Sequence, residues 1–120
     1  MILIVDDDAG LRRFVRAALE NAGYAVEEAG DGAEAVRLLT NSRYELLLTD
    51  IVMPGMDGLK LAAEAHHLDP GLRVIFMTGF TTQYQDELSG SVCLSKPFDS
   101  ATLLLAVESA IGLPRSRSAR

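Results

Sequence analysis

The sequence lacks any apolar run as long as the roughly 20 residues that a membrane-spanning helix needs. No charged and then apolar leader precedes its first apolar segment, so we expect a cytoplasmic protein without membrane contact. It has a single cysteine, Cys93, which cannot form an internal disulfide and fits a reducing compartment. It also lacks an excess of positive charge. The net charge of −6 argues against a nucleic-acid-binding surface.

The composition is that of one globular domain. Of the 120 residues, 48% are hydrophobic and 23% charged, which is enough apolar material for a single core. A glycine at position 112 and a proline at 114 end the last apolar segment, and only a basic polar stretch follows. We therefore predict a domain over residues 1–113 and a disordered basic tail over residues 114–120.

Four apolar runs of strand length each end on polar or charged residues, and turn signals follow. The runs and the residues that close them are Ile2 to Val5 before Asp6-Asp7-Asp8, Leu46 to Leu48 before Thr49-Asp50, Val74 to Met77 before Thr78-Gly79, and Val92 to Ser95 before Lys96-Pro97. In a parallel sheet such strand ends share one edge, where ligands bind. The closing residues are therefore candidates for one site.

Helical patterns alternate with these runs, which predicts right-handed βαβ units. The predicted helices cover Ala9 to Ala22, Ala33 to Thr40, a segment capped by Asp57, a weak segment from Thr81 to Leu88, and Ser100 to Ile111. A weakly alternating outer strand occupies Ala25 to Ala29. The expected fold is an α/β, flavodoxin-like, doubly wound parallel sheet of five strands in the order 2-1-3-4-5, with a short or irregular fourth helix.

That strand order brings Asp6, Asp7 and Asp50 close together, because neighbouring strands lie about 4.8 Å apart. Clustered carboxylates repel one another unless a cation lies among them, and Mg²⁺ with oxygen ligands is the natural choice. The Thr78 hydroxyl and the Lys96 ammonium would approach Asp50 from the other side. A carboxylate nucleophile, a metal, a hydroxyl and a cation are what phosphoryl transfer requires. We therefore expect transfer of a phosphoryl group onto Asp50.

The same segments resemble the receiver (CheY-like) domain of bacterial two-component response regulators. The matching motifs are Ile-Leu-Ile-Val-Asp-Asp-Asp, the loop Thr-Asp-Ile-Val-Met-Pro-Gly-Met-Asp-Gly, Phe-Met-Thr-Gly around Thr78 and Ser-Lys-Pro-Phe around Lys96. They occur in the order of the family and cover about Met1 to Leu113. Any one motif alone is weak, whereas the four together are specific.

The resemblance implies a role for each residue of the acidic group. Asp50 would be the phosphoacceptor and also a metal ligand, and Asp7 would be a direct ligand of Mg²⁺. Asp6 would hold the ion through a water, and the backbone carbonyl of Val52 would complete the protein ligands. Such a domain is a signalling module, and its only catalysis is of its own phosphorylation and dephosphorylation.

The resemblance also implies that Thr78 and Lys96 would bind phosphoryl oxygens and signal their presence. It further implies the partners of the domain. The donor would be a histidine kinase or a histidine phosphotransfer protein that docks near the first helix, where Arg12, Arg13 and Arg16 are expected to face solvent. A downstream protein would read the change, and phosphorylation-dependent dimerisation stays open. The start directly on a strand at Met1 slightly favours a complete single-domain regulator over part of a larger protein.

Two features depart from the family pattern. Cys93 stands at the switch position, where the family usually has Tyr or Phe, and a cysteine cannot make the ring rotation of that aromatic residue. The interval from Thr78 to Lys96 is about four residues shorter than usual, roughly one helical turn, so the fourth helix and output through it should be unusual. Val52 and Phe80 are apolar where a polar side chain would position attacking water, which predicts a slowly decaying acyl phosphate.

Other interpretations of the same residues stay open. Asp8 is expected to cap the first helix, and Asp6 and Asp7 could do the same. Asp6-Asp7-Asp8 also fits the Asp-x-Asp motif of haloacid-dehalogenase-like phosphatases, with Asp6 as nucleophile, although the later acidic pair and the cap segment are missing. A degenerate receiver that acts only as an interaction module is the non-catalytic alternative. Cys93 is expected to be a small buried hydrophobe.

Overall fold

The computed structural model describes residues 1–79 and 91–114. Its centre is a parallel sheet of five strands in the order β2-β1-β3-β4-β5, as the sequence predicts. The strands are β1 (Ile2–Val5), β2 (Val26–Ala29), β3 (Leu46–Asp50), β4 (Arg73–Thr78) and β5 (Val92–Ser95). The bounds of β1 and β5 agree with the prediction, whereas β2 begins one residue later and β4 is one residue longer at each end.

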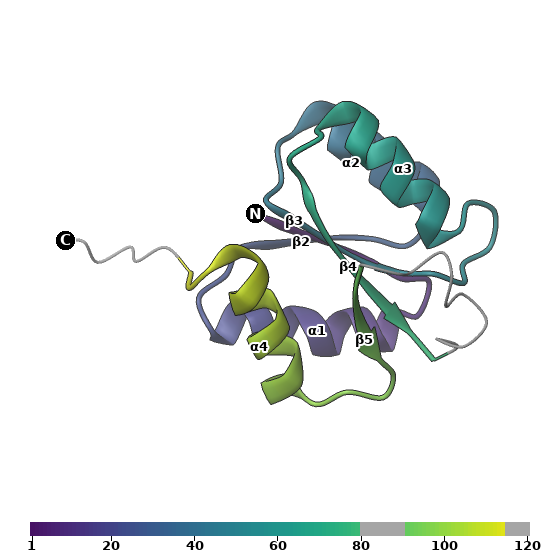
Figure 1. The fold of residues 1–120 in the computed structure, drawn as a ribbon. Coiled ribbons are helices and arrows are strands. Elements are labelled where there is room, and N and C mark those ends of the chain that lie inside the picture. The colour runs from purple at the N-terminus through teal and green to yellow at the C-terminus, as the bar shows by residue number, and fades with distance from the viewer. Residues whose placement is uncertain (80–90, 115–120) are drawn as a thin grey trace.

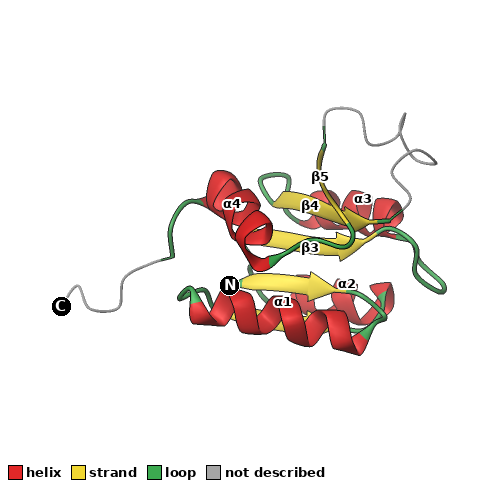
Figure 2. Ribbon diagram, turned by 90° about the horizontal axis from the view of Figure 1, so that it is seen from below, coloured by secondary structure: helices red, strands yellow, loops and turns green. Residues whose placement is uncertain are grey.

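Helices lie on both faces of the sheet. They are α1 (Ala9–Asn21), α2 (Gly32–Asn41), α3 (Gly58–Leu68) and α4 (Ser100–Ile111). Figures 1 and 2 show α1 and α4 on one face and α2 and α3 on the other. The predicted fourth helix, Thr81 to Leu88, lies outside the described residues, so α4 is the helix expected at Ser100 to Ile111. Among the described residues, no helix combines the length and the apolar character that crossing a bilayer would take.

An aspartate begins each of these helices. Asp8, Asp31, Asp57 and Asp99 are the N-caps of α1, α2, α3 and α4, and each side chain accepts hydrogen bonds from backbone amides of the first turn. A carboxylate at this position satisfies orphan amides and interacts favourably with the helix dipole. The predicted caps Asp8 and Asp57 are confirmed. The cap Asp8 follows the end of β1 by only three residues, so Asp6 and Asp7 lie in the short connection at the sheet edge.

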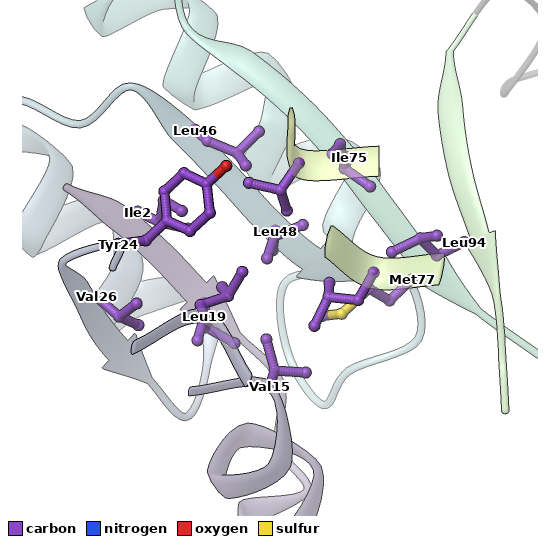
Figure 3. Close-up of a cluster of buried hydrophobic side chains, with 13 residues drawn as sticks. Ile2, Val15, Leu19, Tyr24, Val26, Leu46, Leu48, Ile75, Met77 and Leu94 are labelled. Atoms are coloured by element: carbon purple, nitrogen blue, oxygen red, sulfur yellow. The ribbon is translucent and has the colours of Figure 1, made fainter. Parts of the chain in front are cut away.

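The central strands are buried on both faces, which explains their unbroken apolar sequences. Side chains alternate between two clusters, as the two-residue period of a strand requires. Ile2, Ile4, Leu46 and Leu48 pack toward α1 and α4, in the cluster of Figure 3. Leu3, Val5 and Leu47 pack toward α2 and α3. The sheet is thus a rigid base for the residues that follow its strands.

Candidate functional site

The polar residues that follow the apolar runs all lie at one edge of the sheet, because all five strands are parallel. Asp6 follows β1, Asp50 ends β3, Thr78 ends β4 and Lys96 follows β5. Asp50 pairs with Met77 in the register of β3 and β4, so Thr78 is the next residue along β4. The backbone amide of Lys96 donates to the carbonyl of Thr78 at 2.9 Å. The expected convergence of four chain segments is therefore present.

Asp6 is a fully buried carboxylate with both oxygens engaged. Its Oδ1 accepts from the backbone amide of Asp8 at 2.9 Å, and its Oδ2 accepts from Lys96 Nζ at 3.0 Å. Burial raises the pKa of Asp6 above its ordinary value, and the Asp8 amide and the Lys96 ammonium only partly oppose that rise. Asp6 is thus a carboxylate whose charge needs a neighbouring cation.

Asp50 lies in the next strand, with only a small part of its side chain exposed. Its Oδ1 accepts from the backbone amide of Ile51 at 2.8 Å, and its Oδ2 lies 3.2 Å from Lys96 Nζ. The chain then turns sharply, because the amide of Gly58 donates to the carbonyl of Ile51 at 2.8 Å. The Ile51 amide fixes the orientation of the carboxylate and keeps Oδ2 on the side of Lys96.

Glycine is required at position 58 because the start of α3 lies directly against the backbone of Asp50. A Cβ atom built there would lie 2.1 Å from the carbonyl oxygen of Asp50 and 2.9 Å from the Cα of Ile51. Both are backbone atoms, which cannot rotate away as a side chain can. The Asp57-Gly58 pair, which the sequence shows as a turn, therefore also sets the position of the candidate nucleophile.

Lys96 joins the two buried carboxylates. Its Nζ lies 3.0 Å from Asp6 Oδ2 and 3.2 Å from Asp50 Oδ2. Burial alone would lower the pKa of Lys96, but the hydrogen bond and charge of Asp6, and then those of Asp50, outweigh it and raise the pKa. The ammonium is thus protonated at neutral pH. The following Lys96-Pro97 peptide bond is cis.

Asp7 completes an acidic group with these two carboxylates. One carboxylate oxygen from each of Asp6, Asp7 and Asp50 can be chosen so that all lie within 4.8 Å of one another, with Asp7 exposed and the other two buried. Three carboxylates and the Lys96 ammonium leave an excess of two negative charges when all are ionised. Hard oxygen donors at this spacing, open to solvent on the Asp7 side, fit a small divalent ion such as Mg²⁺.

The structure describes three of the four remaining predicted residues. Thr78 is buried at the end of β4, and the Val52 side chain, two residues after Asp50, is exposed. Cys93 is half buried on β5 and packs against the small cluster of Ile51, Ala62 and Phe76. Burial raises the pKa of the Cys93 thiol, so the cysteine behaves as a small hydrophobe. Phe80 lies outside the described residues.

One residue of this region was assigned wrongly from the sequence. Arg12 was expected to face solvent, but only 19% of its side chain is exposed. Its Nη1 donates to the backbone carbonyl of Asp6, and its Nε donates to Glu28 Oε1 at 2.9 Å. Helical spacing placed Arg12 on the polar face of α1, and the only sequence signal of its contact was the pair of glutamates, Glu27 and Glu28, within the short strand β2.

Comparison with known proteins places these features in one family. A family model described as the response regulator receiver domain matches residues 2–108. A response regulator receiver protein of Brucella abortus, CpdR, is 43% identical over 111 residues, covering 89% of this chain and 92% of that protein. Sporulation initiation phosphotransferase F of Bacillus subtilis is 35% identical, over 82% of each chain.

Solved structures show the same likeness. The chemotaxis protein CheY4 of Vibrio cholerae superposes with a TM-score of 0.85 at 28% identity, covering 92% of this chain and 97% of that one. The response regulator TrrA of Thermotoga maritima superposes with a TM-score of 0.83 at 29% identity, with the same coverage, and its structure was determined as a complex with Mg²⁺ and beryllofluoride.

Proposed function

Because the chain belongs to the response regulator receiver family, whose members are phosphorylation-dependent modules of two-component signalling, we propose that Asp50 is its phosphoacceptor. The observation that carries this assignment is the position of the Asp50 carboxylate beside Asp6 and Asp7 and within 3.2 Å of Lys96 Nζ. The Ile51 amide holds one of its oxygens, and the other lies on the side of Lys96. Attack by Asp50 forms a phosphorus–oxygen bond as the bond from phosphorus to the donor breaks.

The acidic group would bind the Mg²⁺ that receiver domains generally use. Asp7 and Asp50 would bind it directly, Asp6 would act through a water, and the Val52 carbonyl would supply a further oxygen. When bound, the ion neutralises charge on the transferred phosphoryl group. Asp6 suits an indirect role because its carboxylate is fully buried, whereas Asp7 is exposed.

Lys96 and Thr78 would bind the oxygens of the phosphoryl group. Lys96 Nζ contacts the buried carboxylates and is therefore within reach of a group attached to Asp50. Thr78 lies on the next strand, beside the partner of Asp50 in the register. These two residues would exchange interactions with the protein for interactions with the phosphoryl group, and so convert the modification into a change of the β4 and β5 ends.

The partners would be those of a receiver. A histidine kinase or a histidine phosphotransfer protein would supply the phosphoryl group near α1, and a downstream protein would recognise the phosphorylated form. The likeness to a Bacillus subtilis protein named as a phosphotransferase supports relay partners. The only reactions of the chain itself would be the gain and loss of its own phosphoryl group.

The switch would lack its usual aromatic component. Cys93 occupies the switch position on β5, where the family usually has an aromatic residue, and its side chain packs toward Phe76 and Ile51. A thiol is too small to transmit the movement of Thr78 by swinging between two positions. We therefore place the conformational response in the ends of β4 and β5 and in Lys96.

The structure disfavours the phosphatase alternative with Asp6 as nucleophile. Asp6 is 0% exposed, whereas Asp50 retains some exposure at 8%. A nucleophile must reach phosphorus in line with the leaving group, and the complete burial of Asp6 leaves it no such approach.

The test is chemical labelling. The protein is incubated with a small acyl phosphate, with and without Mg²⁺, and the modified residue is located by mass spectrometry after reduction of the acyl phosphate. We expect Mg²⁺-dependent modification at Asp50 that is absent from Asp50→Ala. Modification at Asp6 would support the phosphatase, and absence of modification would support a degenerate module.

A further inference from the structure

Arg12 links its helix to the residue that follows β1 through a specific side-chain contact. Arg12 lies in α1, and its guanidinium donates to the Asp6 carbonyl, six residues earlier in the chain. The same guanidinium lies beside the turn after β2, where a Cβ atom on Gly30 would be 3.5 Å from Nη1. One side chain therefore connects α1, β1 and β2 at the edge of the sheet that carries the acidic group.

The Asp6 carbonyl needs a donor at this point because the neighbouring strand has ended. The amide of Asp6 still donates to the carbonyl of Ala29 at 3.3 Å, as the last bond between β1 and β2. Beyond Ala29 the chain turns away, and the amide of Gly30 donates to Glu34 Oε1 at 3.0 Å. A carbonyl buried at the end of a ladder is costly without a partner. The Arg12 guanidinium supplies the hydrogen-bond donor that a longer β2 would otherwise provide.

The guanidinium is itself held in place by a shared carboxylate. Glu28 on β2 accepts from Arg12 Nε through Oε1 and from Arg16 Nη1 through Oε2, both at 2.9 Å. The side chains of Arg12 and Glu28 are 19% and 22% exposed, against 39% for Arg16. Because Glu28 balances the charge of Arg12, the guanidinium acts on the acidic group mainly through geometry and hydrogen bonding.

From this geometry we propose that Arg12 is a positioning residue for the divalent-ion site, an inference that rests on the proposed function. The carbonyl that Arg12 binds belongs to the peptide group between Asp6 and Asp7. A change in the ψ angle of Asp6 would turn this carbonyl and displace Asp7, the exposed member of the acidic group. By fixing this peptide, Arg12 sets the direction of the Asp7 carboxylate toward Asp50.

Two variants separate this role from a merely structural one. Arg12→Lys keeps the charge and can keep the ion pair with Glu28. A single ammonium, however, cannot donate to Glu28 and to the Asp6 carbonyl from two separate nitrogens, as the guanidinium does. Arg16→Ala is the matched control, because Arg16 is on the same helix and binds the same Glu28 without contacting Asp6. If Arg12→Ala fails to fold, Arg12→Lys decides the question.

The experiment measures the dissociation constant of Mg²⁺ for each protein by titration followed in amide NMR spectra, with urea unfolding as the check on folding. Loss of an outer-shell partner of a metal site typically weakens metal binding by about 10- to 100-fold. We expect weakening of at least about tenfold in Arg12→Ala and at least about threefold in Arg12→Lys, with Arg16→Ala near the wild type. The Asp7 amide signal should also shift in Arg12→Lys before Mg²⁺ is added.

Smaller weakening in a folded Arg12→Lys protein, or equal weakening in Arg16→Ala, overturns the inference. Asp7→Ala tests the proposed function separately. If Asp7→Ala binds Mg²⁺ as the wild type does, the proposed ion site itself is wrong. If Asp7→Ala loses the ion while Arg12→Lys keeps it, only the role of Arg12 is wrong.

Discussion

Replacement of Gly58 by alanine tests how closely the start of α3 determines the position of Asp50. The new Cβ would lie 2.1 Å from the Asp50 carbonyl oxygen, where ordinary contact begins at 3.4 Å, so the two backbones must separate by 1.3 Å. Alanine in a helix gains up to about 1 kcal/mol over glycine. Overpacking costs about 1–3 kcal/mol, and the hydrogen bond between Gly58 and Ile51 that would stretch contributes about 1 kcal/mol. The balance predicts destabilisation by about 2 kcal/mol.

The assay is urea unfolding followed by circular dichroism, together with the rate of phosphorylation by an acyl phosphate. Gly79→Ala is the control, because a Cβ atom there meets nothing within 4 Å and the residue does not need a positive φ angle. Its stability should stay within about 1 kcal/mol of the wild type. A Gly58→Ala protein as stable and as rapidly phosphorylated as Gly79→Ala would refute the argument.

Three further predictions concern individual side chains. Burial raises the pKa of Cys93, so its alkylation at neutral pH should be much slower in the folded protein than in urea, and equal rates would contradict its packing. Burial and the hydrogen bond to Glu27 raise the pKa of Tyr44 from 10.0 to about 12. Because the folded value is the higher one, the stabilisation is complete below pH 10 and is lost as the pH rises toward 12, and Tyr44→Phe should lack this part of the loss in urea unfolding. Val52 presents an exposed apolar side chain two residues after Asp50, so the acyl phosphate should decay faster in Val52→Asn, as followed by phosphorus NMR; equal lifetimes would argue against positioning of water from residue 52.

The strands were predictable from local patterns, and their order and the edge that carries the site followed from the common order of doubly wound parallel sheets. The unbroken apolar sequence of β3 indicates a strand buried on both faces, and a carboxylate at its end must then lie at the edge. The caps Asp8 and Asp57 were predictable for the same reason, since an N-cap depends on residues within one turn.

Some contacts between distant segments were not predictable from one sequence. The helical pattern assigns Arg12 to the polar face of α1, where a charged residue is expected. Only the fold brings Glu28 and the Asp6 carbonyl within its reach. The sequence around Gly58 is typical of a turn, so a glycine there is expected for that reason alone. The close approach of the Asp50 backbone, which excludes a Cβ atom, is seen only in the structure. The approach of Lys96 to Asp50 was expected from the strand order, whereas the contact of Lys96 with Asp6 was not. Sequence patterns identify candidate residues, whereas their partners depend on tertiary packing.

The most direct test of the central claim is a crystal structure of the protein with Mg²⁺ and beryllofluoride, a mimic of a phosphoryl group. The account predicts beryllium on an Asp50 oxygen, fluorides within hydrogen-bond distance of Lys96 Nζ and the Thr78 hydroxyl, and Mg²⁺ bound by Asp7, Asp50 and the Val52 carbonyl. Beryllofluoride attached to another residue, or an Asp50 adduct that neither Lys96 nor Thr78 contacts, would contradict it.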